Sequence, residues 1–176
     1  DWHGQPATPE VLGERRGNRE DLAKHYYAKA QLAGKTASVP APDFLVAAKW
    51  YKRITEVYPK DPQVAEMNFM LGESLYNGGR TLEAAQEFTK TAYGYPVHPR
   101  ARDAAYDAVL AFYKYAETLS GPAKDDATRM AVNGSLKLAD TFPTTTNALP
   151  LPTRPAQAPY APRAQSREII GGSRQI

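Results

Sequence analysis

Apolar side chains recur every three or four residues between about positions 18 and 143, and no segment there alternates regularly between apolar and polar residues. The first spacing places apolar residues on one face of a helix, whereas a strand would show a period of two. The pattern predicts an all-α fold with six helices in three hairpins. These hairpins are expected at about residues 18–59, 62–96 and 99–143.

Proline-containing turns separate the predicted hairpins. Y-P-K-D-P at Tyr58–Pro62 is echoed by Y-P-V-H-P at Tyr95–Pro99, and more weakly by F-P-T at Phe142–Thr144. A proline cannot continue a helix and favours extended backbone in the residue before it, but it is tolerated where the next helix begins. Each pentapeptide therefore predicts the end of one helix and the start of another.

The second helix of each hairpin carries the same order of side chains before its closing proline. Three positions recur at i, i+4 and i+7, which places them on one face of a helix. The first is always alanine, and the second is aromatic in the first two hairpins. Small alanines allow a neighbouring helix to approach closely. The positions are Ala47, Tyr51 and Ile54 before Pro59; Ala84, Phe88 and Thr91 before Pro96; and Ala131, Ser135 and Leu138 before Pro143.

Other local signals place the remaining boundaries. Asn18 is a candidate cap for the first helix, Asn77–Gly79 predicts the turn inside the middle hairpin, and Ser120–Pro122 predicts the end of the fifth helix. Compared with the middle hairpin, the outer two are expected to have longer inner loops, around Gly34–Pro42 and Ser120–Asp126.

The middle hairpin, L-G-E-S-L-Y-N-G-G-R-T-L-E-A-A-Q-E-F-T-K-T-A-Y-G-Y-P, resembles a tetratricopeptide repeat (TPR). The matching signature positions are Leu71, Gly72, Leu75, Ala84, Phe88 and Pro96. Asn68 and Thr91 depart from the signature, where a large aromatic and a small apolar residue are usual. The resemblance implies three TPR-like hairpins in a short right-handed solenoid. The Y-P-x-x-P endings are similar to those of bacterial cell-envelope members, the outer-membrane-assembly lipoproteins, which implies a cell-envelope or extracellular location.

Composition narrows the function classes. The chain has 176 residues, of which 42% are hydrophobic, with a formal net charge of +3 and no cysteine. This charge is too small to indicate nucleic-acid binding by itself, and disulfide or thiol chemistry is excluded. No apolar run is long enough for a transmembrane helix. The first residue is Asp1 rather than Met, which fits either a removed leader or a piece of a longer protein.

No catalytic motif is recognisable. P-loop, dinucleotide-binding, zincin and nucleophile-elbow patterns are absent from the sequence. His3, His25 and His98 have no metal-site spacing, and His25 reads as an ordinary helix residue. Asp125–Asp126 suits the start of a helix better than a catalytic pair. We therefore expect a protein that is not an enzyme and uses no cofactor or metal.

The TPR resemblance implies a concave groove, lined by the first helix of each hairpin, that binds a peptide. Acidic and aromatic residues occupy the groove positions here, which excludes the basic clamp that some TPR proteins use for acidic C-termini. Such a groove should prefer a Pro- or Arg-containing segment. Alternatively, any one of the tyrosines belongs to the core. The candidate groove residues are Tyr27, Glu66, Phe69, Glu73, Tyr76, Asp103, Tyr106 and Tyr113.

The two ends of the chain are predicted to be extended arms, residues 1–17 and 144–176. The C-terminal arm holds five prolines, four arginines and one acidic residue, a composition typical of polyproline-like segments. No capping helix is predicted after Phe142, so an apolar end of the stack would remain open. The candidate assembly residues in the arms are Trp2, Arg154, Tyr160, Arg163, Arg167, Ile169 and Ile170.

These features lead to a hypothesis of a structural or scaffold protein that mediates protein–protein assembly. Its partners would be proteins, including other copies of itself that associate head to tail through the arms into a filament. The alternative is a cell-envelope adaptor that binds a different protein or peptide in its groove. An enzyme or a nucleic-acid binder is a third class, which the balanced charge of the repeats disfavours.

Overall fold

The computed structural model describes residues 8–34 and 42–143, and these residues form six α-helices without a strand. The predicted all-α class is confirmed. The helices are α1 (Pro9–Gly34), α2 (Asp43–Val57), α3 (Val64–Asn77), α4 (Thr81–Tyr93), α5 (Ala101–Glu117) and α6 (Gly121–Thr141).

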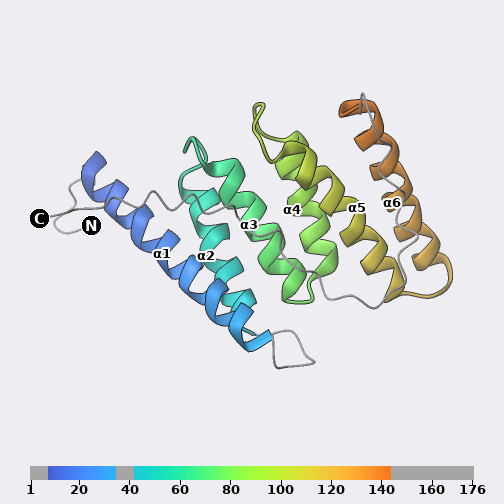
Figure 1. The fold of residues 1–176 in the computed structure, drawn as a ribbon, viewed down its shortest axis with the longest axis horizontal. Helices are drawn as coiled ribbons and strands as arrows, with labels where there is room; N and C mark the ends of the chain where they lie inside the picture. Colours follow the sequence, from blue (N-terminus) through green and yellow to red (C-terminus); the bar gives the residue numbers. More distant parts are fainter. Residues whose placement is uncertain (1–7, 35–41, 144–176) are drawn as a thin grey trace, which may run out of the picture.

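The helices stand in a row in chain order (Figure 1). The extensive packing contacts of each helix are with the helix before it and the helix after it. Because α2 to α5 each have a neighbour on both sides, they bury two sides, whereas α1 and α6 form the two ends of the row. The apolar residues left exposed at these ends include Leu32 on α1 and Leu136 on α6.

Helix α1 begins at Pro9, nine residues before the predicted cap Asn18. The prediction of an extended arm over residues 1–17 is therefore wrong for residues 9–17, and residues 1–7 lie outside the described part. The local reason is the start signal T-P at Thr8 and Pro9. The Thr8 hydroxyl accepts a hydrogen bond of 3.4 Å from the Val11 amide, and proline at the first helical position needs no hydrogen bond for its nitrogen.

Helix α6 begins at Gly121, so the predicted long loop over Ser120–Asp126 is also wrong. Only three residues separate α5 from α6. Gly121 has a φ of +59°, a conformation that glycine adopts without steric cost, and Pro122 follows in the first turn of the helix. The sharp reversal therefore comes from these two residues together. The other predicted long loop falls largely on residues 35–41, outside the described part.

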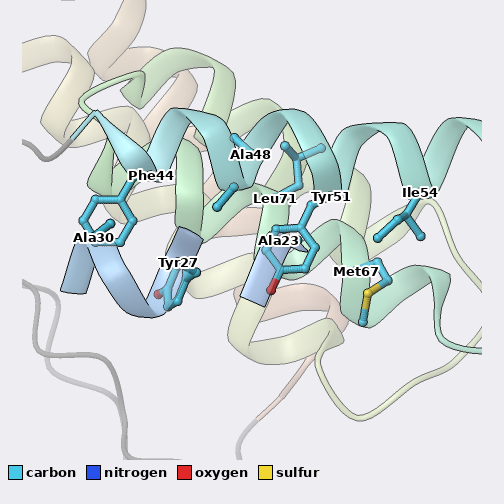
Figure 2. Packing of buried hydrophobic residues seen from close by; sticks show 10 residues of the cluster. Ala23, Tyr27, Ala30, Phe44, Ala48, Tyr51, Ile54, Met67 and Leu71 are labelled. Atoms are coloured by element: carbon cyan, nitrogen blue, oxygen red, sulfur yellow. The ribbon is translucent and has the colours of Figure 1, made fainter. Parts of the chain in front are cut away.

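Two apolar clusters fill the spaces between the helices. The first joins α1, α2 and α3, and Figure 2 shows Ala23, Tyr27 and Ala30 of α1 facing Tyr51 and Phe44 of α2. The second joins α3, α4 and α5 and reaches α6 through Leu138 and Phe142. The small residues of the repeated pattern, Ala47, Ala84 and Ala131, are each 0% exposed, which is what close helix approach requires.

Helices α3 and α4 pack closely at Gly72. A Cβ atom added there would lie 2.6 Å from Cδ1 of Phe88, well inside van der Waals contact. Phe88 is 2% exposed and is also packed against Phe69, with ring centroids 5.5 Å apart. Gly72 therefore makes room for the large residue of the neighbouring helix.

Candidate interaction surface

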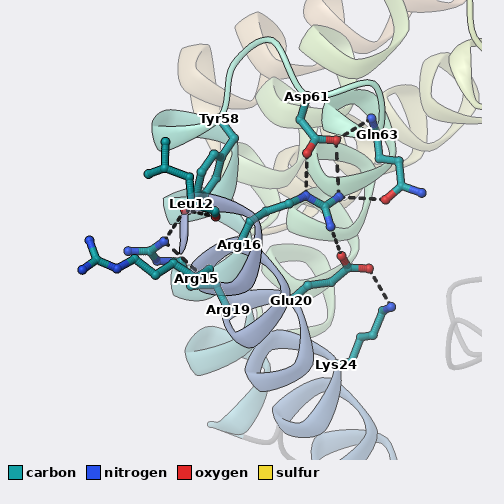
Figure 3. Close-up of polar contacts among 9 residues, drawn as sticks. All are labelled: Leu12, Arg15, Arg16, Arg19, Glu20, Lys24, Tyr58, Asp61 and Gln63. Carbon is teal, nitrogen blue, oxygen red and sulfur yellow. Dashed lines mark hydrogen bonds and ion pairs between the residues drawn. The ribbon is translucent and has the colours of Figure 1, made fainter. Parts of the chain in front are cut away.

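The first proline turn fastens the N-terminal half of α1. The Tyr58 hydroxyl accepts a hydrogen bond of 2.7 Å from Nη1 of Arg19 and donates one of 3.2 Å to the carbonyl oxygen of Leu12. The Arg19 guanidinium also lies 5.7 Å from the centre of the Tyr58 ring. Tyr58 thus contacts both the backbone and a side chain of α1 (Figure 3).

Arg16 makes the second connection between α1 and this turn. Its guanidinium donates to both carboxylate oxygens of Asp61, to Glu20, and to Oε1 of Gln63 at 2.7 Å (Figure 3). Lys24 forms a further ion pair with Glu20 at 2.6 Å. Desolvation opposes ionisation of Glu20, but the hydrogen bonds and charges of Lys24 and Arg16 outweigh it and lower the pKa of Glu20.

These polar contacts matter because the same half of α1 contributes little to the core. Among its described side chains, none before Ala23 is buried. The Arg16, Glu20 and Asp61 side chains are only 13–18% exposed, so their attraction is less screened than that of a surface pair. We call the group of Arg16, Glu20, Asp61 and Gln63 the α1 clasp.

The second proline turn is fastened to the core instead. The Tyr95 hydroxyl donates a hydrogen bond of 3.0 Å to Oδ1 of Asn68. Asn68 in turn donates bonds of 2.9 Å to the Thr91 hydroxyl and to the carbonyl oxygen of Glu87. Tyr95 therefore reaches a buried polar pair, and burial raises the pKa of Tyr95 to about 12.

Three of the predicted groove residues lie together on the α1, α3 and α5 side. The Tyr27 hydroxyl donates a hydrogen bond of 3.3 Å to Oε2 of Glu73. Glu73 and Tyr76 line a small, partly open depression of about 10 Å³, which we call the α3–α5 hollow. Burial raises the pKa of Tyr76. The hollow is lined by Glu73 and Tyr76 of α3, Phe88 of α4, and Asp107 and Leu110 of α5.

Two other predicted groove residues are held by Arg100. Glu66 accepts hydrogen bonds of 2.8 and 3.0 Å from Nε and Nη2 of Arg100. The same guanidinium lies 4.8 Å from the centre of the Phe69 ring. The bonds to Glu66 and the charges of Glu66, Glu73 and Asp103 raise the pKa of Arg100, with desolvation opposing them. Glu66 and Phe69 thus join α3 to the turn before α5.

The remaining predicted positions divide into two groups. Asp103, Tyr106 and Tyr113 are half-buried on α5. Tyr27 and Phe69, described above, are buried, with 8% and 4% exposure. The predicted arm residues lie outside the described part of the chain. They are Trp2, Arg154, Tyr160, Arg163, Arg167, Ile169 and Ile170.

Sequence reasoning missed Asp107, Arg100 and the α1 clasp. Asp107 follows Asp103 by four residues, so the two carboxylates share one face of α5, and this spacing could have identified it. The clasp joins residues 45 positions apart, and no local spacing reveals such a pair.

Residues 8–34 and 42–143 offer no group of three histidine, aspartate or glutamate side chains positioned to hold a metal ion. None of the described helices has the length and hydropathy needed to cross a membrane. Comparisons with protein families, with curated proteins and with solved structures found no match to this chain. We therefore infer the candidate interaction surface from the structure of this chain alone, and the α3–α5 hollow lies at its centre.

Proposed function

We propose that this chain is a non-enzymatic scaffold protein of the TPR type, whose repeats mediate protein–protein assembly. The TPR assignment is supported by the row of helices in chain order, by the buried alanines at matched positions, and by the Gly72–Phe88 approach. Stacked two-helix units bury together what one unit cannot bury alone.

The α3–α5 hollow is the observation that carries the functional proposal. Residues of two consecutive hairpins line it, among them Glu73, Tyr76 and Asp107, and the surface open within it is apolar. Aromatic and apolar groups with a few polar groups at the edge are suited to holding a peptide side chain. The carboxylates disfavour nucleic acid at this face, because its phosphates would be repelled.

In the first form of the proposal the partner is another copy of the chain. The basic C-terminal arm of one copy would bind the acidic face of the next, and repetition of this head-to-tail contact would give a filament. Light scattering over a range of concentrations, with negative-stain imaging, tests this on the full chain. A variant with Arg154, Arg163, Arg167 and Arg174 replaced by serine is the comparison.

Particles of the full chain that become larger with concentration would support self-assembly, provided that this increase is lost in the arginine variant and at high salt. A monomer at every concentration would exclude it. The second form is then favoured, in which the chain is a cell-envelope adaptor and its face binds a different protein.

A further inference from the structure

Helix α6 exposes an apolar stripe with a carboxylate near each end. Its members recur at i, i+7, i+11 and i+15, which places them on one face of the helix, directed away from buried Ala131. Val132 and Leu136 in this stripe are 43% and 61% exposed. Neither of its aspartates forms an ion pair within residues 8–34 and 42–143. We call the set the α6 stripe: Asp125, Val132, Leu136 and Asp140.

The cations of α6 leave the charge of this stripe in place. Arg129 on the same face already pairs with Asp126. The Nζ atom of Lys137 lies 3.8 Å from the centre of the Tyr93 ring, so this side chain is turned toward α4. Lys124 precedes the two buried alanines of α6 by three and seven residues and therefore shares the side that packs on α5. The stripe thus presents negative charge beside aliphatic surface.

At the other end of the row, α1 and α2 form an edge with aromatic residues on both helices. Lys29 lies 5.8 Å from the centre of the Tyr26 ring and forms an ion pair of 3.0 Å with Asp43 of α2. Trp50 follows Asp43 by seven residues, so the two share one face of α2. Tyr26 and Trp50 are half-buried and both pack against the first apolar cluster. The two rings therefore lie along the same edge of the hairpin.

This edge combines apolar surface with guanidinium groups. The α1 members recur at i, i+7 and i+11, and the α2 members at i, i+3 and i+7, each set on one helix face. Leu22 and Val57 are 39% and 38% exposed. Neither arginine of the set has an ion-pair partner among the described residues. We call the set the α1–α2 edge: Arg15, Leu22, Tyr26, Trp50, Arg53 and Val57.

We propose that the α6 stripe of one copy binds the α1–α2 edge of the next copy. Both surfaces hold exposed aliphatic residues and unpaired charges, and the charges are opposite, so carboxylates of one copy can receive guanidinium groups of the other. This inference rests on the proposed function, because it names the surfaces through which copies would associate. Since the two surfaces differ and lie at opposite ends of the row, the contact is heterologous and gives a chain of copies.

Direct stacking of α6 on the outer face of α1 is disfavoured by charge. Glu14 and Asp21, seven residues apart and exposed, share the face of α1 that is directed away from its buried alanines. Their carboxylates would oppose Asp125 and Asp140 of the neighbouring copy. The α1–α2 edge is therefore the better partner for the α6 stripe.

The test is a charge exchange in the full chain, measured by sedimentation velocity and light scattering over a range of concentrations at low salt. R15E/R53E makes the edge acidic, and D125K/D140K makes the stripe basic. Each variant alone should associate at least about tenfold more weakly than the unmodified chain, because like charges then meet. An equimolar mixture should associate again, since each reversed surface finds its complement on the other variant. Circular dichroism checks that both variants are folded.

The matched control is R80E/R102E, which reverses two exposed arginines in the turn before α4 and on α5. It should change association by less than about twofold. Leu136→Ser removes apolar surface from the stripe without changing its charge and should also weaken association.

Association that is unchanged in both R15E/R53E and D125K/D140K would overturn the inference, while self-assembly through the C-terminal arm would stand. A mixture of the two folded variants that stays monomeric would exclude direct contact between the edge and the stripe. The arm is read separately, from the variant with its four arginines replaced by serine. Association that persists there but is lost in the charge reversals would assign assembly to the edge and the stripe. A monomer of the unmodified chain at every concentration would exclude self-assembly and this inference with it.

Discussion

The side-chain amide of Asn68 donates a hydrogen bond of 2.9 Å to the hydroxyl of Thr91, and both side chains are 0% exposed. These are the two positions at which the middle hairpin departs from the TPR signature. The structure shows that the departures form a pair: Asn68 on α3 meets Thr91 on α4. The Thr91 hydroxyl also donates a bond of 2.9 Å to the carbonyl oxygen of Glu87, so a small polar network replaces an apolar contact.

Removing both members of this pair should destabilise the protein by less than the sum of the two single losses. Asn68→Ala leaves the Tyr95 hydroxyl without its partner, opens a cavity, and should lower the free energy of unfolding by about 2–4 kcal/mol. Thr91→Val alone should lower it by about 1–2 kcal/mol, since the Asn68 amide loses a partner. The double variant should show a coupling of at least about 0.5 kcal/mol in urea unfolding. Strict additivity would mean that the pair makes no energetic contribution.

Gly72→Ala should destabilise the α3–α4 contact. The added methyl group meets the Phe88 ring at 2.6 Å, and overpacking of this kind lowers the free energy of unfolding by about 1–3 kcal/mol. Gly13→Ala in α1 is the matched control, because nothing lies within 4 Å of a Cβ at that position. That control should raise helix stability by up to about 1 kcal/mol. Phe88→Leu should recover part of the loss at Gly72, and a failure of this rescue would place the strain elsewhere.

Opening of the α1 clasp should release the N-terminal half of α1 while leaving the rest folded. Arg16→Gln removes the ion pairs with Asp61 and Glu20, and no described side chain before Ala23 is buried to compensate. Hydrogen exchange of the amides in residues 12–22 should accelerate about tenfold, with little change in α3 and α4. Arg53→Gln, an exposed arginine on α2, is the control. Uniform acceleration along the whole chain would show that α1 unfolds only with the other helices.

The clasp should also weaken in acid. The pKa of Glu20 is lowered in the folded state, so its contribution to stability is complete above the usual glutamate pKa and is lost as the pH falls through the lowered value. Amide chemical shifts of residues 16–24 in the full chain should follow this titration. In Glu20→Gln that titration should be absent. A Glu20 carboxyl that titrates at or above its usual pKa would contradict the ion pairs with Arg16 and Lys24.

The sequence was sufficient to predict that the chain forms helices, because apolar spacing, proline turns and recurring alanines are local signals of where helices run and stop. The start of α1 was missed because its first half has no buried face, so its helical signal is Thr8 and Pro9 alone. The start of α6 was missed because Ser-Gly-Pro was read as a loop, whereas Gly121 and Pro122 make the reversal within the helix start. The candidate site was only partly predictable. Glu73 and Tyr76 follow from repeat register, but Asp107 depends on how α5 packs beside α3.

The two Y-P-x-x-P turns have a consequence for engineering with this chain. Tyr58 follows α2 directly and is bonded to α1, whereas Tyr95 follows Tyr93, the last residue of α4, by two positions and is bonded to Asn68. The prolines in both turns mark where a helix stops, but the tyrosines attach the turns to different parts of the molecule. The hairpins are therefore not interchangeable parts. Exchanging, duplicating or deleting one of them would also require the residues that receive its tyrosine to be moved with it.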